Sequence, residues 1–344
     1  MSATQTETRY VLEPSDEYCH EPDDASNFNE SMYFNAYDPV RRVGGWFRIG
    51  NRVNEGYAEM SCCVYLPDGR VGFMFKRPKI SSNAALDAGG MRIEVVEPFA
   101  RLRVTYTGSV VVLARPREMV DPAKAFRENP VVSCRIALDY TGIAPMWGGR
   151  PIRADGGKAA SDAAGSFAKA HYEQHMAVHG HIGVGDEEYE IAGFGLRDKS
   201  WGARYWQAIR WYRWLPISFD AEFGMMISLI GDGTRTRQSG MVLRDGAYVP
   251  IREASIESEW DPEDYQTALR VRARTDERTY EIAGRVLSLI PLRNRRTAPD
   301  GTLLHTRITE GMTEYRCDGK IGYGLSEYLD QIVDGRPVGP DVTG

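Results

Sequence analysis

Short apolar runs separated by turn-forming residues recur along almost the whole chain, and this rhythm limits the fold more than any other feature of the sequence. Between residues 57 and 75, two such runs flank Pro67-Asp68-Gly69, where glycine accepts the positive φ of a tight hairpin turn. Further turn signals occur at Asp245-Gly246, Pro299-Asp300-Gly301 and Asp318-Gly319. Turns at short intervals are typical of antiparallel meanders and barrels. The sequence therefore predicts an all-β protein.

The sequence predicts few helices. Five prolines rule out a long helix across most of residues 115–170: Pro116, Pro122, Pro130, Pro145 and Pro151. Two helical segments remain in our prediction, the alanine-rich stretch from Lys158 to His175 and a short closing helix from Gly324 to Val333.

The length of 344 residues suits two domains of about 150–200 residues each. We place a poorly ordered, acidic lead-in at residues 1–30, an N-terminal domain at 31–172 and a C-terminal domain at 173–344. Each domain is expected to be an antiparallel β-barrel or curled sheet. A barrel mouth, or the cleft between two sheets, is where a small ligand would bind.

Charge and hydropathy exclude several partners. The net charge is −6 and no long basic run is present, whereas a phosphate-binding surface needs clustered lysine and arginine. We therefore expect no nucleic acid partner. The longest apolar stretch, Val110 to Ala114, is far short of the roughly 20 residues that span a bilayer. With no secretory signal visible at the start, we expect a cytoplasmic protein without stable membrane insertion. The oligomeric state stays open.

The five cysteines indicate reduced thiols. Their number is odd, and Cys62 and Cys63 are neighbours whose side chains point to opposite faces of a strand. These two residues therefore cannot easily form a disulfide or share a metal.

The densest polar segment is Gly193 to Gly202. On a strand, Arg197, Lys199 and Trp201 share one face, and Asp198 shares the other with Ser200. Five aromatic residues follow: Tyr205, Trp206, Trp211, Tyr212 and Trp214. Tryptophan rings can line an apolar pocket and face a developing cation. The alternative interpretation is a structural ion pair of Asp198 beside an aromatic core.

Four histidines lie close together: His171, His175, His179 and His181. Spacings of four and two residues can bind zinc, but the H-E-x-x-H form is lacking and the predicted helix changes to strand inside the cluster. We expect hydrogen-bonded structural histidines, no metal and no cofactor. Nucleotide-binding glycine fingerprints and a G-x-S-x-G elbow are also lacking.

The segment 193–202 resembles the hallmark of the carotenoid hydratase (hydroxyneurosporene synthase-like) family, an Asp-His-x-Trp-Gly stretch preceded by glycines. Here it reads Asp198-Lys199-Ser200-Trp201-Gly202. The wider layout is similar at Pro67-Asp68-Gly69, His171-Tyr172-Glu173-Gln174, Gly322-Tyr323-Gly324 and Glu327-Tyr328. The resemblance covers most of residues 30–330 and is faint outside these points.

The resemblance implies two lipocalin-like (calycin-type) domains with a pocket at or between them. Members of the family add water to isoprenoid double bonds, and others shape pericyclic cyclisations. Asp198, Trp201 and Gly202 match the family motif directly, whereas Lys199 replaces its histidine. A lysine shuttles protons near neutral pH only if burial lowers its pKa, so this departure puts the family's chemistry in question.

Hydration of an alkene needs a carboxylic acid held protonated in a dry site. We assign Asp198 and Lys199 as candidate catalytic residues. The candidate substrate-binding residues are Ser200, Trp201, Tyr205, Trp206, Trp211, Tyr212 and Glu327. The predicted function is a hydratase or dehydratase acting on an isoprenoid- or steroid-like molecule. A protein that binds a hydrophobic ligand without catalysis, and a cyclase that works by shape, remain alternatives.

Overall fold

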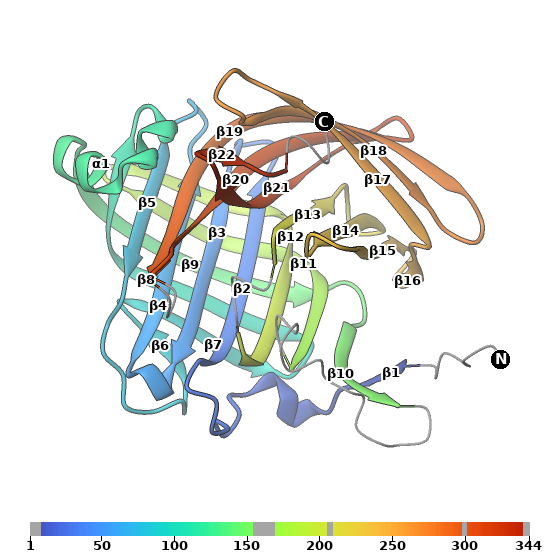
Figure 1. Cartoon of the computed structure of the whole chain (residues 1–344), viewed down its shortest axis with the longest axis horizontal. Coiled ribbons are helices and arrows are strands. Elements are labelled where there is room, and N and C mark those ends of the chain that lie inside the picture. The colour runs from blue at the N-terminus through green and yellow to red at the C-terminus, as the bar shows by residue number, and fades with distance from the viewer. Residues whose placement is uncertain (1–7, 154–168, 205–208, 298–300, 340–344) are drawn as a thin grey trace.

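Two large antiparallel sheets make up the computed structural model, which describes residues 8–153, 169–204, 209–297 and 301–339 (Figure 1). The first sheet contains β1 (Thr8–Val11), β2 (Phe28–Asp38), β3 (Val43–Arg52), β4 (Tyr57–Tyr65), β5 (Val71–Lys76), β6 (Leu86–Ala88), β7 (Met91–Glu97), β8 (Arg101–Leu113), β9 (Val131–Gly142), β10 (Trp147–Arg153), β11 (Ala170–Val184) and β12 (Glu187–Ala203). The second contains β13 (Trp211–Ser218), β14 (Phe223–Gly231), β15 (Thr236–Arg244), β16 (Ala247–Pro250), β17 (Glu253–Trp260), β18 (Gln266–Arg274), β19 (Thr279–Thr297), β20 (Leu303–Cys317), β21 (Lys320–Val333) and β22 (Arg336–Pro337). The all-β prediction is confirmed.

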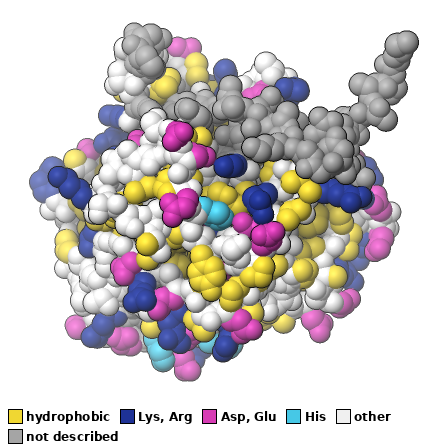
Figure 2. Space-filling model, turned by 90° about the horizontal axis from the view of Figure 1, so that it is seen from below, with side chains coloured by type: hydrophobic (Ala, Val, Ile, Leu, Met, Phe, Trp, Pro, Cys, Tyr) yellow, Lys and Arg dark blue, Asp and Glu magenta, His cyan; other side chains and the backbone are white. Residues whose placement is uncertain are grey.

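Helical structure in these described ranges is limited to α1 (Pro122–Glu128) and three short 3₁₀ helices at Pro14–Glu17, Val53–Glu55 and Pro116–Val120. No helix there is long and apolar enough to cross a bilayer. Seen from below, acidic and basic side chains are interspersed around a central group of apolar ones (Figure 2).

The first sheet closes on itself. Strands β11, β12, β2, β3, β4, β5, β8 and β9 are hydrogen-bonded in this order, and β9 pairs back to β11. Alternate residues point inward, as Met32, Phe34 and Ala36 of β2 do, and their side chains fill the interior. Because the barrel is packed with side chains, its interior is a core.

The second sheet lies over one outer side of the barrel, with β19, β20 and β21 passing above β2 to β5 (Figure 1). The Tyr65 hydroxyl of β4 donates a hydrogen bond to the Glu310 carbonyl of β20 at 3.0 Å. The Tyr37 and Tyr323 rings pack with their centroids 4.8 Å apart. Side chains that point outward from the barrel strands, such as those of Tyr33 and Tyr37, therefore pack against the second sheet.

The passage between the sheets differs from the boundary we expected at 172/173. Strands β11 and β12 belong to the barrel, because β11 pairs with β9 and β12 pairs with β2. The first sheet ends at Ala203 and the second begins at Trp211. The hairpin β11–β12 was correctly predicted, but the partners of its outer edges are distant in sequence and leave no local signal.

Residues 8–30 are not a loose lead-in, as we expected, but part of the first sheet and a plug for one end of the barrel. The Glu17 carboxylate is fully buried and accepts two hydrogen bonds from the Arg197 guanidinium, at 2.5 and 2.9 Å. Gln174 and Tyr172 complete this network. A charge buried this deeply requires its partner, so the acidic lead-in is held in place by β12.

Both predicted helices are wrong where the structure describes them. His171 and His175 lie on β11, and residues 324–333 belong to β21. Residues 158–168 lie outside the described ranges. The sequence favoured helices from alanine content and length, but pairing with neighbouring strands overrides such weak propensities.

The cysteine prediction is confirmed. Cys62 lies in the barrel core, whereas Cys63 faces the second sheet. Neither forms a disulfide, and the same holds for Cys19, Cys134 and Cys317.

The buried Glu17–Arg197 pair predicts a large and specific loss of stability. Glu17→Gln leaves the Arg197 charge buried without a counter-charge and should lower the free energy of unfolding by about 3–5 kcal/mol in urea titrations. The matched control is Asp276→Asn, which breaks the exposed Arg252–Asp276 pair and should cost less than about 1 kcal/mol. Equal losses in the two variants would contradict the plug.

Candidate functional site

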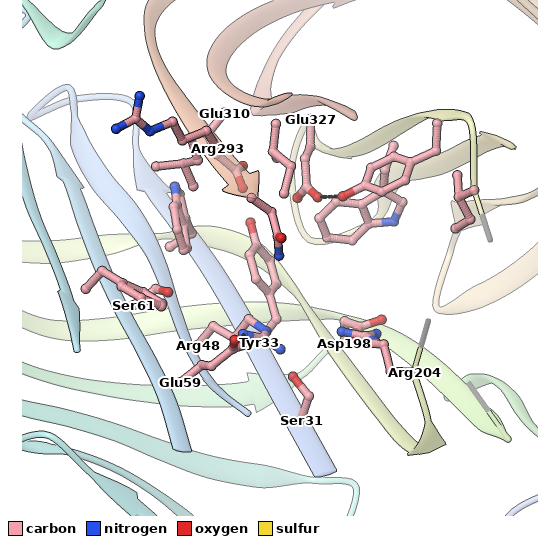
Figure 3. Close-up of a pocket in the computed structure, with 18 of the residues that line it drawn as sticks. Ser31, Tyr33, Arg48, Glu59, Ser61, Asp198, Arg204, Arg293, Glu310 and Glu327 are labelled. Carbon is pink, nitrogen blue, oxygen red and sulfur yellow. Dashed lines mark hydrogen bonds and ion pairs between the residues drawn. The ribbon is translucent and has the colours of Figure 1, made fainter. Parts of the chain in front are cut away.

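A cavity of about 690 Å³ lies between the barrel and the second sheet. The barrel strands supply its floor and strands β13, β14, β19, β20 and β21 supply its roof (Figure 3). Aromatic and aliphatic side chains form much of the wall, among them Trp46, Phe73, Phe126, Trp214 and Leu292. A cavity of this size suits a small organic molecule.

The floor is ordered by strand register. Glu173, Asp198, Tyr33, Arg48 and Ser61 stand opposite one another on five consecutive strands, β11, β12, β2, β3 and β4. Successive residues of a strand alternate between faces, so this register directs the whole row to one side of the sheet. All five line the cavity.

The roof carries a second polar row. Trp214 of β13 is opposite Glu327 of β21, which in turn is opposite Glu310 of β20. The Trp214 indole N–H reaches down to the floor and donates a 2.7 Å hydrogen bond to Glu173 Oε1. Floor and roof therefore meet at this end of the cavity.

Glu310 and Glu327 form a carboxyl pair. Burial, together with the charge of Glu327, raises the pKa of Glu310 well above its usual range. Burial also raises the pKa of Glu327 to about 7, although the Tyr212 hydroxyl donates it a hydrogen bond that opposes the shift. Two carboxyls on facing strand positions cannot both ionise easily, so the pair holds a proton at neutral pH.

The floor has a second acid–base group of three residues. His171 Nε2 is hydrogen-bonded to the Asp198 carboxylate. Desolvation in the cavity works against the charged imidazole, but Asp198 and then Glu173 raise the pKa of His171 to about 9. Burial raises the pKa of Glu173 to about 7, with Asp198 acting in the same direction. These shifts favour a cationic His171 and a partly protonated Glu173 at neutral pH.

Basic residues balance part of this charge. Arg48 donates to Glu59 at 3.3 Å, and Glu59 is also paired with Arg77. Arg204 donates to Ser200 Oγ at 3.1 Å. Burial, followed by repulsion from Arg48, lowers the pKa of Arg204 to about 10.

Three of the sequence-predicted site residues line the cavity: Asp198, Tyr212 and Glu327. Lys199 does not. It is fully buried at the barrel end, where its ammonium group donates to Glu30 at 2.6 Å and to the Tyr18 carbonyl at 2.9 Å. The adjacent Asp198 points to the other face of β12, so the placement of Lys199 in the catalytic site is wrong.

Trp201, Ser200 and Trp211 also fall outside the cavity wall. Trp201 follows Lys199 to the barrel end, where its ring stacks on His20 at 4.0 Å. Ser200 is on the Asp198 side but is covered and bonded to Arg204, and Trp211 packs in the core of the second sheet. Tyr205 and Trp206 lie outside the described residues.

The histidine cluster divides along β11. His175 is buried, and burial lowers its pKa to about 4. Its neutral ring bridges the two sheets, with Nε2 donating to the Ile217 carbonyl and Nδ1 accepting from the Tyr248 hydroxyl, each at 3.1 Å. His179 and His181 are exposed. Only His171 of the four lines the cavity.

One group within the described ranges has the residue types and spacing of a metal site. Ligand atoms of His171, Glu173 and Asp198 lie within 4.8 Å of one another. His171 Nε2 shares a proton with the Asp198 carboxylate, and Arg204 adds positive charge nearby.

Glu310, Arg48 and Glu173 also line the cavity but were not among the predicted site residues. Glu310 is one of several charged residues of β20, and Arg48 lies in the glycine-containing strand β3; neither residue belonged to a motif. Glu173 was noticed only within the family resemblance. They could have been found as ionisable residues at strand positions where the alternation of side chains predicts burial. Burial of an ionisable group is unfavourable unless the group is paired or functional.

The chain belongs to the family described as Domain of unknown function (DUF7064), whose model matches residues 13–332. No curated protein matches the sequence significantly. Among solved structures, the chain is similar to a protein provisionally assigned as AttH from Nitrosomonas europaea, with 14% identity, 93% of this chain and 96% of that chain covered, and a TM-score of 0.63.

Kievitone hydratase from Nectria haematococca is similar at 9% identity, with 93% of each chain covered and a TM-score of 0.54. CghA is similar at 13% identity, with 95% of this chain and 97% of that chain covered and a TM-score of 0.51, and CghA has also been solved with Sch210972. At these identities the comparisons establish a shared all-β fold, which the sequence resemblance implied.

The raised pKa of Glu310 predicts a stability gain on its removal. Ionisation of Glu310 opposes folding at any pH above its ordinary value of 4.5, so Glu310→Gln should be about 1–3 kcal/mol more stable than wild type at pH 8, with a smaller gap at pH 5. Urea titrations at both pH values measure this.

The control is Glu59→Gln. Burial alone would raise the pKa of Glu59, but three arginines lower it, so its ionised form stabilises the fold at neutral pH. Glu59→Gln should therefore be less stable than wild type at pH 8, and the deficit should shrink as the pH falls. A Glu310→Gln variant that loses stability at pH 8 as Glu59→Gln does would contradict the assigned protonation.

Proposed function

We propose that this protein is a hydratase or dehydratase that adds water to, or removes it from, a hydrophobic small molecule bound between the two sheets. The observation that carries the proposal is the placement of ionisable groups of opposite roles on opposite walls of one apolar cavity. A carboxyl pair with raised pKa values lies on the roof, and Glu173, whose pKa is raised to about 7, lies on the floor.

The roof pair suits the role of general acid. An acid must be protonated at the working pH and must lie in a site that excludes water. Glu310 is 4% exposed, and its Oε2 has no hydrogen-bond partner among the described residues. The pair can therefore deliver a proton to one carbon of an alkene that lies below it.

The floor suits the role of base. Glu173 Oε1 is held by Trp214, whereas Oε2 has no hydrogen-bond partner among the residues described. A water molecule attacking the second alkene carbon can give its proton to this oxygen. The Asp198–His171 ion pair lies beside it and holds both side chains in place near the reacting water. Asp198 thus serves as a positioning residue in this proposal, rather than as the acid that the motif suggested.

The protons balance over one turnover. The alkene gains a proton from the roof pair and a hydroxyl from water, and the second proton of that water goes to Glu173. One proton has then moved from roof to floor, and exchange with solvent restores both groups. The reverse sequence describes dehydration with the two roles exchanged.

Support for this proposal also comes from the fold and the sequence. The chain resembles the carotenoid hydratase family at residues 193–202, and one protein of similar fold is named a hydratase. Another has been solved with a small molecule, Sch210972, so the fold accommodates organic ligands of some size. An isoprenoid or steroid-like substrate fits the apolar walls. Ligand binding without chemistry and a shape-driven cyclisation are the outcomes that the next experiment distinguishes.

Turnover can be tested with an extract of hydrophobic metabolites. Wild-type protein should change the mass of at least one species by that of one water, detected by liquid chromatography and mass spectrometry. Glu173→Gln should retain the Trp214 hydrogen bond, since the amide oxygen still accepts it, yet lower the rate by at least about a hundredfold.

The matched control is Glu190→Gln, which changes an exposed carboxyl outside the cavity and should leave the rate unchanged. A species that binds but keeps its mass and retention time would identify a binding protein. One that keeps its mass and changes its retention time would identify a cyclase. Either result would contradict hydration.

The raised pKa values of the carboxyls on the two walls predict how the activity depends on pH. Activity should rise as the pH increases through about 7, because Glu173 must be ionised to accept a proton. It should fall again only at more alkaline pH, where the roof pair loses its proton. In Glu310→Gln the alkaline limb should move down towards 7, because Glu327 alone remains. A profile without the limb near 7 would exclude Glu173 as the base.

A further inference from the structure

Unsatisfied polar atoms gather in the cavity. Buried donors and acceptors normally find partners, because an unpaired one has lost its hydrogen bonds to water without replacing them. Within the described residues, four cavity-lining side chains nevertheless carry a buried polar atom without a partner: Tyr33 Oη, Arg48 Nη2, Glu173 Oε2 and Glu310 Oε2. A bound molecule that meets these atoms would remove that cost.

Two of these atoms, Tyr33 Oη and Arg48 Nη2, are hydrogen-bond donors on two adjacent strands and form what we call the donor patch. Tyr33 of β2 is directly opposite Arg48 of β3, and Trp46 lies two residues before Arg48 on the same face. The Tyr33 and Trp46 rings stack with their centroids 6.1 Å apart. Burial, with the nearby Glu310 and Glu327 charges, raises the pKa of Tyr33 well above its usual range, so its hydroxyl keeps its proton. Figure 3 shows Tyr33 rising from β2 towards the roof, between Arg48 and Glu310.

We propose that this donor patch binds a carbonyl oxygen of the substrate, so that the substrate is an apolar molecule with a carbonyl group conjugated to the reacting double bond. The two donor side chains, Tyr33 and Arg48, each require a hydrogen-bond acceptor. A carbonyl oxygen has two lone pairs and no proton, whereas a hydroxyl would bring a proton of its own into the patch. This inference rests on the proposed function for its chemistry and on the donor patch for its binding.

The carbonyl would set the order of the reaction. Water bonds to the alkene carbon remote from the carbonyl, and its proton passes to Glu173. The alkene electron pair moves towards the carbonyl oxygen, where the donors stabilise the negative charge that develops. The carbon next to the carbonyl then takes a proton from the Glu310–Glu327 pair and the carbonyl re-forms. The roof carboxyl need only protonate an enolate, which is far more basic than an isolated alkene.

Water can also satisfy polar atoms in a cavity of this size, and the test must exclude it. We choose β-ionone, an apolar conjugated ketone, and β-ionol, the alcohol obtained by reducing its carbonyl. The two probes have almost the same shape and differ in the oxygen that would meet the patch. The measurement requires no turnover of either probe, because binding is measured from the quenching of tryptophan fluorescence.

Tyr33→Phe removes only the donor hydroxyl. Its matched control is Tyr140→Phe, because the Tyr140 hydroxyl is also buried and without a partner in the described structure but lies in the barrel core, outside the cavity. Wild type should bind β-ionone more tightly than β-ionol. Tyr33→Phe should weaken β-ionone binding about three- to tenfold and leave β-ionol binding nearly unchanged. Tyr140→Phe should bind both probes as wild type does.

Three outcomes would overturn the inference: equal affinity of wild type for the two probes, no binding of β-ionone up to its solubility limit, or a ketone preference that survives in Tyr33→Phe. The proposed function fails separately. A ketone preference without addition of water to any ketone would support the donor patch and contradict hydration. Hydration of a substrate without a carbonyl would support hydration and contradict the donor patch.

Discussion

The alternation of side chains along β12, fixed by its hydrogen bonds to β11 and β2, is the constraint on which the rest of the structure depends. It sends Arg197 and Lys199 to the barrel end and Asp198 to the cavity. The same register carries across β2 and β3, so that Tyr33 and Arg48 join the cavity floor. A shift of one residue would exchange the two sides, burying the site residues in the core and exposing the core's ion pairs.

Buried charged groups on the two sides of the barrel wall are compensated in different ways. On the inner side, Arg197 is matched by Glu17 and Lys199 by Glu30, each pair fully buried and linked by short hydrogen bonds. On the cavity side, Glu310 and Glu327 form no ion pair with a cation among the described residues, and burial raises the pKa of both. Completed pairs stabilise a fold, whereas incomplete ones leave protons and lone pairs available for a ligand. The cavity therefore carries a cost in stability that the barrel end does not.

The sequence predicted the class of fold and three residues of the cavity wall, Asp198 on the floor and Tyr212 and Glu327 on the roof. Turn residues such as Pro67-Asp68-Gly69 act locally, so hairpins could be identified, and strand parity correctly separated Cys62 from Cys63 and Asp198 from its neighbours. Pairing between distant strands leaves no local trace, which is why the boundary between the sheets was misplaced. Lys199 was assigned to catalysis by its neighbourhood in the motif, although Glu30, its partner, lies far away in the sequence. Glu310 had no motif at all, and only its position opposite Glu327 gives it a role.

The central claim is that the cavity holds a neutral carboxylic acid at pH 7, above a floor carboxyl poised to accept a proton. Infrared difference spectroscopy between wild type and Glu310→Gln, recorded at pH 7, tests this most directly. The account predicts that the substitution removes the carbonyl-stretch band of a protonated carboxyl from a dry environment, and that the band in wild type persists to alkaline pH. Loss of carboxylate bands alone would show that the roof pair is ionised at rest and would contradict the account.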